Sequence, residues 1–128
     1  MLLPLLALAA LFQGAWQEVG RTGTGNPVYV HARTVKTSKD GIISAMVRVV
    51  YAKPAKVPGN KELSSSKAAA MFNCASNTFA VKESWIYLNE KTNTIYQHKV
   101  NKIPGYGVTI GGSFGDVALK HFCSKSAR

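Results

Sequence analysis

Apolar and polar residues alternate along several stretches of the chain, and this pattern predicts β-strands. A period of two residues is typical of an antiparallel strand that buries one face. In Ile42–Tyr51, the apolar face would consist of Ile43, Ala45, Val47, Val49 and Tyr51. The segment Val28–Thr34 alternates in the same way. Further strands are expected at Lys67–Cys74, Phe79–Leu88 and Thr94–Val100.

Turn-forming residues separate these predicted strands, which indicates short connections. They lie at Arg21–Pro27, Ser38–Gly41 and Asn89–Asn93. The segment Lys53–Glu62 contains two prolines and a glycine among its lysines. It is therefore expected to form an exposed basic loop.

The pattern changes to a helical period near the end of the chain. Ser113 is a suitable N-cap for a helix over Phe114–Lys125, and Asp116 follows three residues later as an acidic variant of the capping box. The apolar face of this helix would contain Ala118, Leu119, Phe122 and Cys123. Strands followed by one terminal helix predict an α+β fold, a single antiparallel sheet with the helix packed on one face.

The first residues predict a signal peptide. Residues 2–12 are apolar but too few to span a bilayer, and small residues follow at Gly14 and Ala15. We expect cleavage after Ala15, so that residues 1–15 are the signal and 16–128 form one periplasmic or secreted domain. A buried first helix is the alternative. Because no Cys stands at the cut, no lipid anchor is expected.

The only two cysteines, Cys74 and Cys123, are both predicted to point into the seam between sheet and helix. In an exported protein such a pair favours one disulfide. Two free buried thiols are the alternative. A metal site is not expected, because His121 lies on the opposite face of the helix.

The charge of the chain restricts its partners. Sixteen Lys and Arg against six Asp and Glu give a net charge of +10 over 128 residues. Such a field attracts anionic envelope or host-matrix ligands and acidic protein surfaces. The candidate contact surface consists of basic residues from two segments: Arg33, Lys36, Lys39, Lys53, Lys56 and Lys61.

The sequence contains no recognisable catalytic arrangement. The six carboxylates form no evident pair, and no Gly-x-Ser-x-Gly pattern is present. The glycine-rich stretch Gly105–Gly115 lacks the Gly-Lys-Ser/Thr ending of a phosphate-binding loop. We therefore expect neither an enzyme nor a cofactor nor a metal, although a small periplasmic hydrolase remains an alternative.

A basic nucleic-acid-binding module is a further alternative, because lysines lie near aromatic residues that can stack on bases. However, Trp85 shares its predicted strand face with Phe79 and Val81, which favours a place in the core. An exported protein rarely meets nucleic acid, so no nucleic-acid partner is expected.

An ordered set of short segments resembles the surface-adhesin protein E family of Gram-negative bacteria. The set runs from Trp16-Gln-Glu-Val-Gly through Val49-Val50-Tyr51 and Phe72-Asn73-Cys74 to Lys120-His121-Phe122-Cys123. The resemblance implies about six antiparallel strands, one helix, a disulfide and an envelope location. It also implies adhesin-like binding of a protein or anionic partner without catalysis. The identity of that partner and the oligomeric state stay open.

Overall fold

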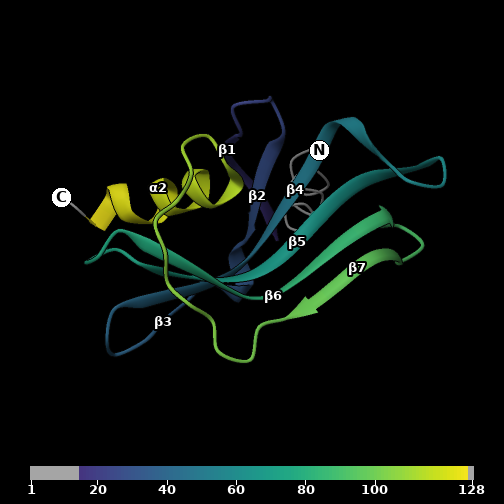
Figure 1. Cartoon of the computed structure of the whole chain (residues 1–128). Helices are drawn as coiled ribbons and strands as arrows, with labels where there is room; N and C mark the ends of the chain where they lie inside the picture. Colours follow the sequence, from purple (N-terminus) through teal and green to yellow (C-terminus); the bar gives the residue numbers. More distant parts are fainter. Residues whose placement is uncertain (1–14, 127–128) are drawn as a thin grey trace, which may run out of the picture.

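The computed structural model describes residues 15–126, which form one antiparallel sheet with a helix on one face (Figure 1). The predicted signal peptide lies outside these residues, apart from Ala15. The strands are β1 (Trp16–Arg21), β2 (Pro27–His31), β3 (Lys36–Thr37), β4 (Ile42–Val57), β5 (Lys61–Asn73), β6 (Thr78–Asn89) and β7 (Thr94–Val100). A 3-10 turn, η1 (Ala32–Thr34), follows β2, and the helix is α2 (Phe114–Ser126).

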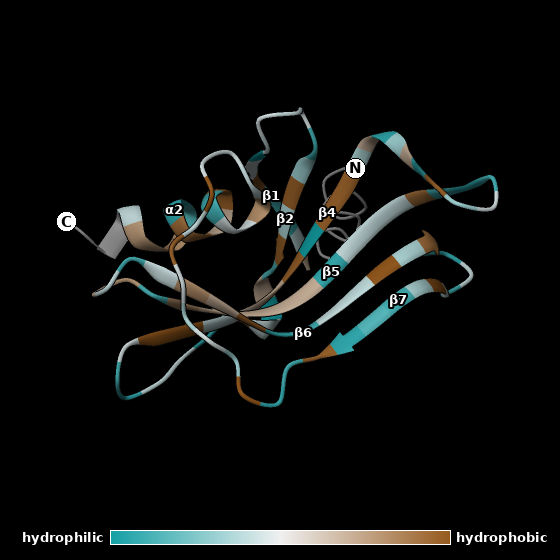
Figure 2. Cartoon of the chain, in the orientation of Figure 1, coloured by the Kyte–Doolittle hydropathy of each residue, from teal (hydrophilic) through white to brown (hydrophobic). Residues whose placement is uncertain are grey.

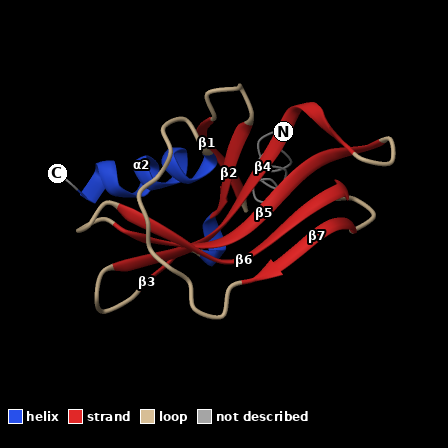
Figure 3. Cartoon of the chain, in the orientation of Figure 1, coloured by secondary structure: helices blue, strands red, loops and turns tan. Residues whose placement is uncertain are grey.

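The strand order confirms the predicted α+β fold. Six strands pair in the order β1-β2-β4-β5-β6-β7, and the two-residue β3 pairs with β4 at the side of this path. Each pairing is antiparallel. Figure 3 shows α2 as the one long helix beside the strands, with the short turn η1 below it. Neighbouring strands in the sheet are mostly consecutive in sequence, as is usual for antiparallel sheets with short connections.

The core forms where α2 lies on the sheet. Its buried residues come from three central strands and the helix: Val28, Val30, Ala45, Val47, Val49, Ala70, Phe72, Ala118 and Leu119. The alternation predicted for Ile42–Tyr51 is confirmed, because Ala45, Val47 and Val49 are buried and lie on the helix side. Burial of this apolar surface is the main force that holds the helix to the sheet.

The start of α2 follows the sequence prediction closely. Ser113 Oγ accepts a hydrogen bond from the Asp116 N–H (3.3 Å), as an N-cap does. The Asp116 carboxylate accepts further bonds from the N–H of Gly112 (3.0 Å) and the hydroxyl of Thr109 (3.1 Å), and it pairs with Lys120 (3.0 Å). The bond from Gly112, then those from Lys120 and Thr109, outweigh desolvation and lower the pKa of Asp116.

A disulfide joins Cys74 to Cys123, as predicted, with the two Cα atoms 5.1 Å apart. Cys74 directly follows β5, and Cys123 lies near the end of α2. The helix also approaches the sheet closely at Gly115, where an added Cβ would lie 2.6 Å from the Phe79 ring. The disulfide and the close packing therefore hold the helix at its two ends.

Two predicted segments differ in the structure. Lys53–Glu62 is not a loop, because β4 and β5 continue as a pair beyond an irregularity between Val50 and Ala55 and turn only at residues 58–60. Pro54 lies within that irregularity, where a missing N–H costs no ladder hydrogen bond. The segment is exposed, as expected. The strand predicted over Val28–Thr34 ends at His31, since the 3-10 turn begins at Ala32.

The position predicted for Trp85 is wrong. Along β6, Ala70 pairs with Val81 but Ala69 pairs with Glu83, so Lys82 is an extra residue in the strand. Such a bulge reverses the alternation of the residues that follow it. Trp85 therefore pairs with Lys67 on the sheet face opposite the helix, where its ring stacks on His98 with 5.4 Å between the ring centroids.

Candidate functional site

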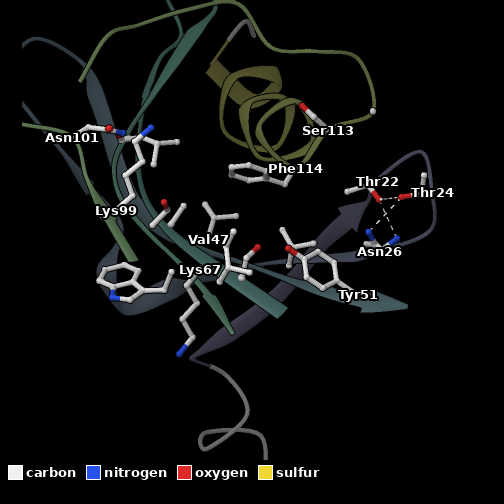
Figure 4. Close-up of a pocket in the computed structure, with 18 residues that line it drawn as sticks. Thr22, Thr24, Asn26, Val47, Tyr51, Lys67, Lys99, Asn101, Ser113 and Phe114 are labelled. Carbon is white, nitrogen blue, oxygen red and sulfur yellow. Dashed lines mark hydrogen bonds between the residues drawn. The ribbon is translucent and has the colours of Figure 1, made fainter. Parts of the chain in front are cut away.

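A groove opens on the helix side of the sheet, because α2 covers only part of that face. The helix contacts β1, β2, β4 and β6 and, through Phe122, the Phe72 ring of β5, but it does not extend over the part of the face that the cavity occupies. The resulting cavity has a volume of about 550 Å³ and lies between the sheet and the start of α2 (Figure 4). Clefts of this size are typical of ligand sites.

The floor of the groove follows from the small side chains of β5. On the helix side, β5 presents Ser66 and Ala68 below the groove and Phe72 below the helix. Where Phe72 stands, aromatic rings fill the space between sheet and helix, with 5.0 Å between the Phe72 and Phe122 ring centroids. Where β5 presents the small side chains of Ser66 and Ala68, the space above the sheet stays open. In the sequence, the signal for this groove is the pair of small residues Ser66 and Ala68, which alternate along one face of β5.

The groove has an apolar middle and two polar ends (Figure 4). Val47 and Phe114 lie near its centre, from β4 and the start of α2. Thr22, Thr24 and Asn26 lie together at one end, in the turn between β1 and β2. This turn is held by bonds such as that from the Asn26 N–H to Thr22 Oγ1 (3.1 Å). An elongated ligand would thus meet polar groups at both ends.

Lys99 and Asn101 form the other polar end of the groove. Asn101 is held in place by a hydrogen bond from its side-chain amide to the Val81 carbonyl (2.8 Å). Lys67 also lines the cavity, but its ammonium points away and pairs with Glu90 at 3.4 Å. Lys99 has no ion-pair partner among residues 15–126. It is therefore the cation of the groove that remains available to an anionic ligand group.

The titratable groups that line the groove are two lysines and one tyrosine. These are Tyr51, Lys67 and Lys99, and the lining includes neither a carboxylate nor an imidazole. General acid–base chemistry at neutral pH mostly relies on His, Asp or Glu within hydrogen-bond reach of substrate. Elsewhere in residues 15–126, no three potential metal ligands gather into one group.

The predicted basic contact surface is divided in two. Arg33 in η1 and Lys36 in β3 lie with Lys39 near the start of β4. The other three lysines, which we call the basic hairpin, are Lys53, Lys56 and Lys61 near the tip of β4 and β5. About 12 residues of β4 separate the two sets, or about 40 Å of extended strand. All six side chains are exposed, but they form two surfaces rather than one.

The comparison with protein families decides the assignment, because the family described as surface-adhesin protein E matches residues 16–124. The chain belongs to the surface-adhesin protein E family. The resemblance seen in the sequence is therefore confirmed, and membership implies a non-enzymatic protein exported to the envelope or surface. Neither the curated proteins nor the solved structures gave a significant match. Within residues 15–126, the protein E family member has no helix long and apolar enough to cross a membrane.

The opposite face of this family member's sheet carries a carboxylate, Glu90, whose partners come from two strands, β4 and β5. Glu90 follows β6 and reaches back over the sheet, where it accepts hydrogen bonds from Ser65 (2.6 Å) and Arg48 (2.9 Å) and pairs with Lys67 (3.4 Å). Desolvation by burial raises the pKa of Glu90, but the bonds from Ser65 and Arg48 and the two positive charges outweigh it. The net pKa lies below the ordinary value. The cluster clamps the β6–β7 turn onto β4 and β5.

We predict that Glu90→Gln destabilises the fold by about 1–2 kcal/mol at neutral pH, as expected for charge-assisted hydrogen bonds in a half-exposed cluster. Because the folded-state pKa is lowered, the carboxylate's contribution is present above its unfolded pKa, near 4.5, and is lost as the pH falls through the lower folded value. Urea unfolding measured from pH 7 to pH 3 should give free energies of unfolding for wild type and variant that become equal at low pH. A difference in free energy of unfolding that stays constant with pH would contradict this role of Glu90.

Proposed function

We propose that this protein E family member is a non-catalytic envelope protein that binds a partner protein in its groove. The observation that carries the proposal is the cavity itself, which places an apolar floor between two polar ends and offers Lys99 at one of them. The occupant we infer is an apolar segment of the partner with a carboxylate that meets Lys99. Apolar clefts with a few placed polar groups are the usual form of such sites.

The charge of the protein supports an acidic partner. A net charge of +10 raises the rate at which an oppositely charged protein encounters the surface. We propose that the basic hairpin and the Arg33–Lys39 segment contribute to this attraction as two separate surfaces. The partner would be an acidic protein of the same envelope or of a host matrix, and both present the same chemistry to the groove.

Site-specific photo-crosslinking in cells that express the protein tests the groove. A crosslinking residue at Ser66, on the groove floor, should give a discrete adduct with one partner protein. The same residue at Thr92, in the exposed β6–β7 turn, is the matched control. Lys99→Glu should reduce the Ser66 adduct about tenfold or more, since it replaces an attraction by a repulsion. Lys91→Glu, outside the groove, should leave it unchanged.

Two outcomes would contradict the groove as the binding site. One is an adduct at Thr92 but none at Ser66. The other is an equal loss of the Ser66 adduct in Lys99→Glu and Lys91→Glu, which would show that net charge alone drives the contact.

A further inference from the structure

Within residues 15–126, the exposed apolar surface is concentrated along one edge of the sheet. Seven of the eight large hydrophobic residues that are exposed there fall within one stretch of the chain: Ile95, Tyr96, Val100, Ile103, Tyr106, Val108 and Ile110. Ile103 and Val108 are 92% and 80% exposed, so they contribute almost nothing to the core. Figure 2 shows brown intervals towards the ends of β7 and in the segment after it, with teal between them. Contiguous exposed apolar surface on a monomer usually marks an interaction site.

The same edge has unpaired backbone groups. β7 is the last strand in the sheet order, and its outer side pairs with no strand of the described chain. The Asn101 N–H donates inward, to the Lys82 carbonyl at 2.9 Å. Backbone N–H groups alternate in direction along a strand, and the pairing of β6 with β7 is regular from His98 to Val100. Counting back from the inward N–H of Asn101, the N–H groups of Val100 and His98 therefore point outward. An edge with free donors is a template for an added strand.

The charge of this edge indicates which chain would be added. No acidic residue occurs between Glu90 and Asp116, whereas Lys99 and Lys102 lie within the stretch. Two such edges would repel each other, which disfavours pairing with a second copy. A lipid surface is also disfavoured, because hydrocarbon cannot satisfy the outward backbone groups of β7.

We propose that the β7 edge, meaning β7 with the segment 101–112, docks an extended acidic segment of a partner protein as an added β-strand. The added strand takes up the outward N–H groups of His98 and Val100. Its apolar side chains cover exposed residues such as Val100 and Val108, and its carboxylates meet Lys102. This edge adjoins the groove at Lys99 and Asn101, but the proposal does not depend on the groove's being occupied.

Binding of a synthetic peptide tests the proposal on the whole domain. The probe is an eight-residue peptide of alternating Glu and Val, compared with its Lys–Val counterpart by fluorescence anisotropy. We expect the acidic peptide to bind and the basic peptide not to bind. Hydrogen exchange should slow at the His98 and Val100 amides when the acidic peptide is present, because these groups then donate to the added strand.

Variants separate the backbone, apolar and charge contributions. Val100→Pro removes one outward N–H, which an edge strand tolerates, and should weaken binding about tenfold. The double variant Ile103→Ser with Val108→Ser should weaken binding and leave the backbone hydrogen-bonding groups of β7 unchanged, because both residues lie after the strand. Val35→Ser is the matched control, since Val35 is the one exposed large hydrophobic outside the edge in the part of the chain that the structure describes. Lys102→Glu should weaken binding more than Lys56→Glu in the basic hairpin.

Several results would overturn the proposal. Equal binding of both peptides, or protection that appears only in the basic hairpin, would show that β7 is not the site. If wild type sediments as a dimer and Val100→Pro sediments as a monomer, the edge pairs with a second copy of the chain. Binding to phosphatidylglycerol vesicles that is lost in the Ile103 and Val108 variant but kept in Val100→Pro would assign it to a membrane.

Discussion

Replacing Cys123 with Ser is expected to destabilise the domain by about 2–5 kcal/mol, as is usual when a small exported domain loses its disulfide. The bond to Cys74 closes a loop across 49 positions, and on the entropic account a loop of that length restricts the unfolded chain by about 4 kcal/mol. This is a large share of the 5–15 kcal/mol that stabilises a typical domain. The helix should loosen first, since the disulfide is the bond that ties its C-terminal part to the sheet.

Thermal melts of Cys123→Ser and Cys74→Ser, followed by circular dichroism, measure this effect. The two single variants and the double variant should lose nearly the same stability, because each removes the same bond. Ser124→Ala, at the next and exposed position of α2, is the matched control and should melt as wild type does. Variants as stable as wild type would show that packing alone holds the helix. Because Phe114 of α2 lines the groove, the cysteine variants should also lose groove adducts at lower temperature than wild type.

Phe72→Ala is expected to cost about 3–5 kcal/mol, the range for removing a fully buried aromatic ring. Phe72 has no exposed surface, and its ring packs between Phe122 of α2 and Phe79 of β6, with centroid distances of 5.0 and 6.4 Å. Removal of the ring would leave a cavity between the sheet and the helix. The free-energy cost of this cavity should therefore add to the cost of no longer burying the ring.

Met71→Ala is the matched control for Phe72→Ala. Met71 is the preceding residue of β5, is half-buried and lies on the opposite face of the sheet. Its truncation should cost clearly less, because part of the side chain is already in water. Chemical unfolding of the two variants gives the comparison. If both variants lost the same free energy of unfolding, the sheet as a whole, rather than the contact between sheet and helix, would limit stability.

The groove and the β7 edge are both consequences of the position of α2. The helix is anchored over β1, β2 and the ends of β4 and β6, and it leaves the other part of the same face open. The segment 101–112 must connect β7 to the start of the helix, and its apolar residues stay outside the core. A single packing arrangement thus leaves two surfaces free for partners.

The sequence alone determined the elements that depend on local pattern. Alternation at Ile42–Tyr51 identified the central strand and its buried face, and Ser113 with Asp116 marked the start of the helix. The Cys74–Cys123 disulfide was also predictable, because the strand phase and the helix phase each turned one sulfur inward. These features could be predicted because each depends on side-chain direction within one continuous element.

Only the tertiary structure decided how these elements continue and what they leave uncovered. The extra residue Lys82 moved Trp85 to the other face, and cross-strand pairing converted the expected loop after Lys53 into a hairpin. Both depend on hydrogen bonds between strands, which a local pattern does not contain. The separation of Arg33 from Lys56, and the groove above Ala68, depend on strand length and on where the helix begins. These are relations between distant segments, so they are set by packing and register rather than by any single stretch of sequence.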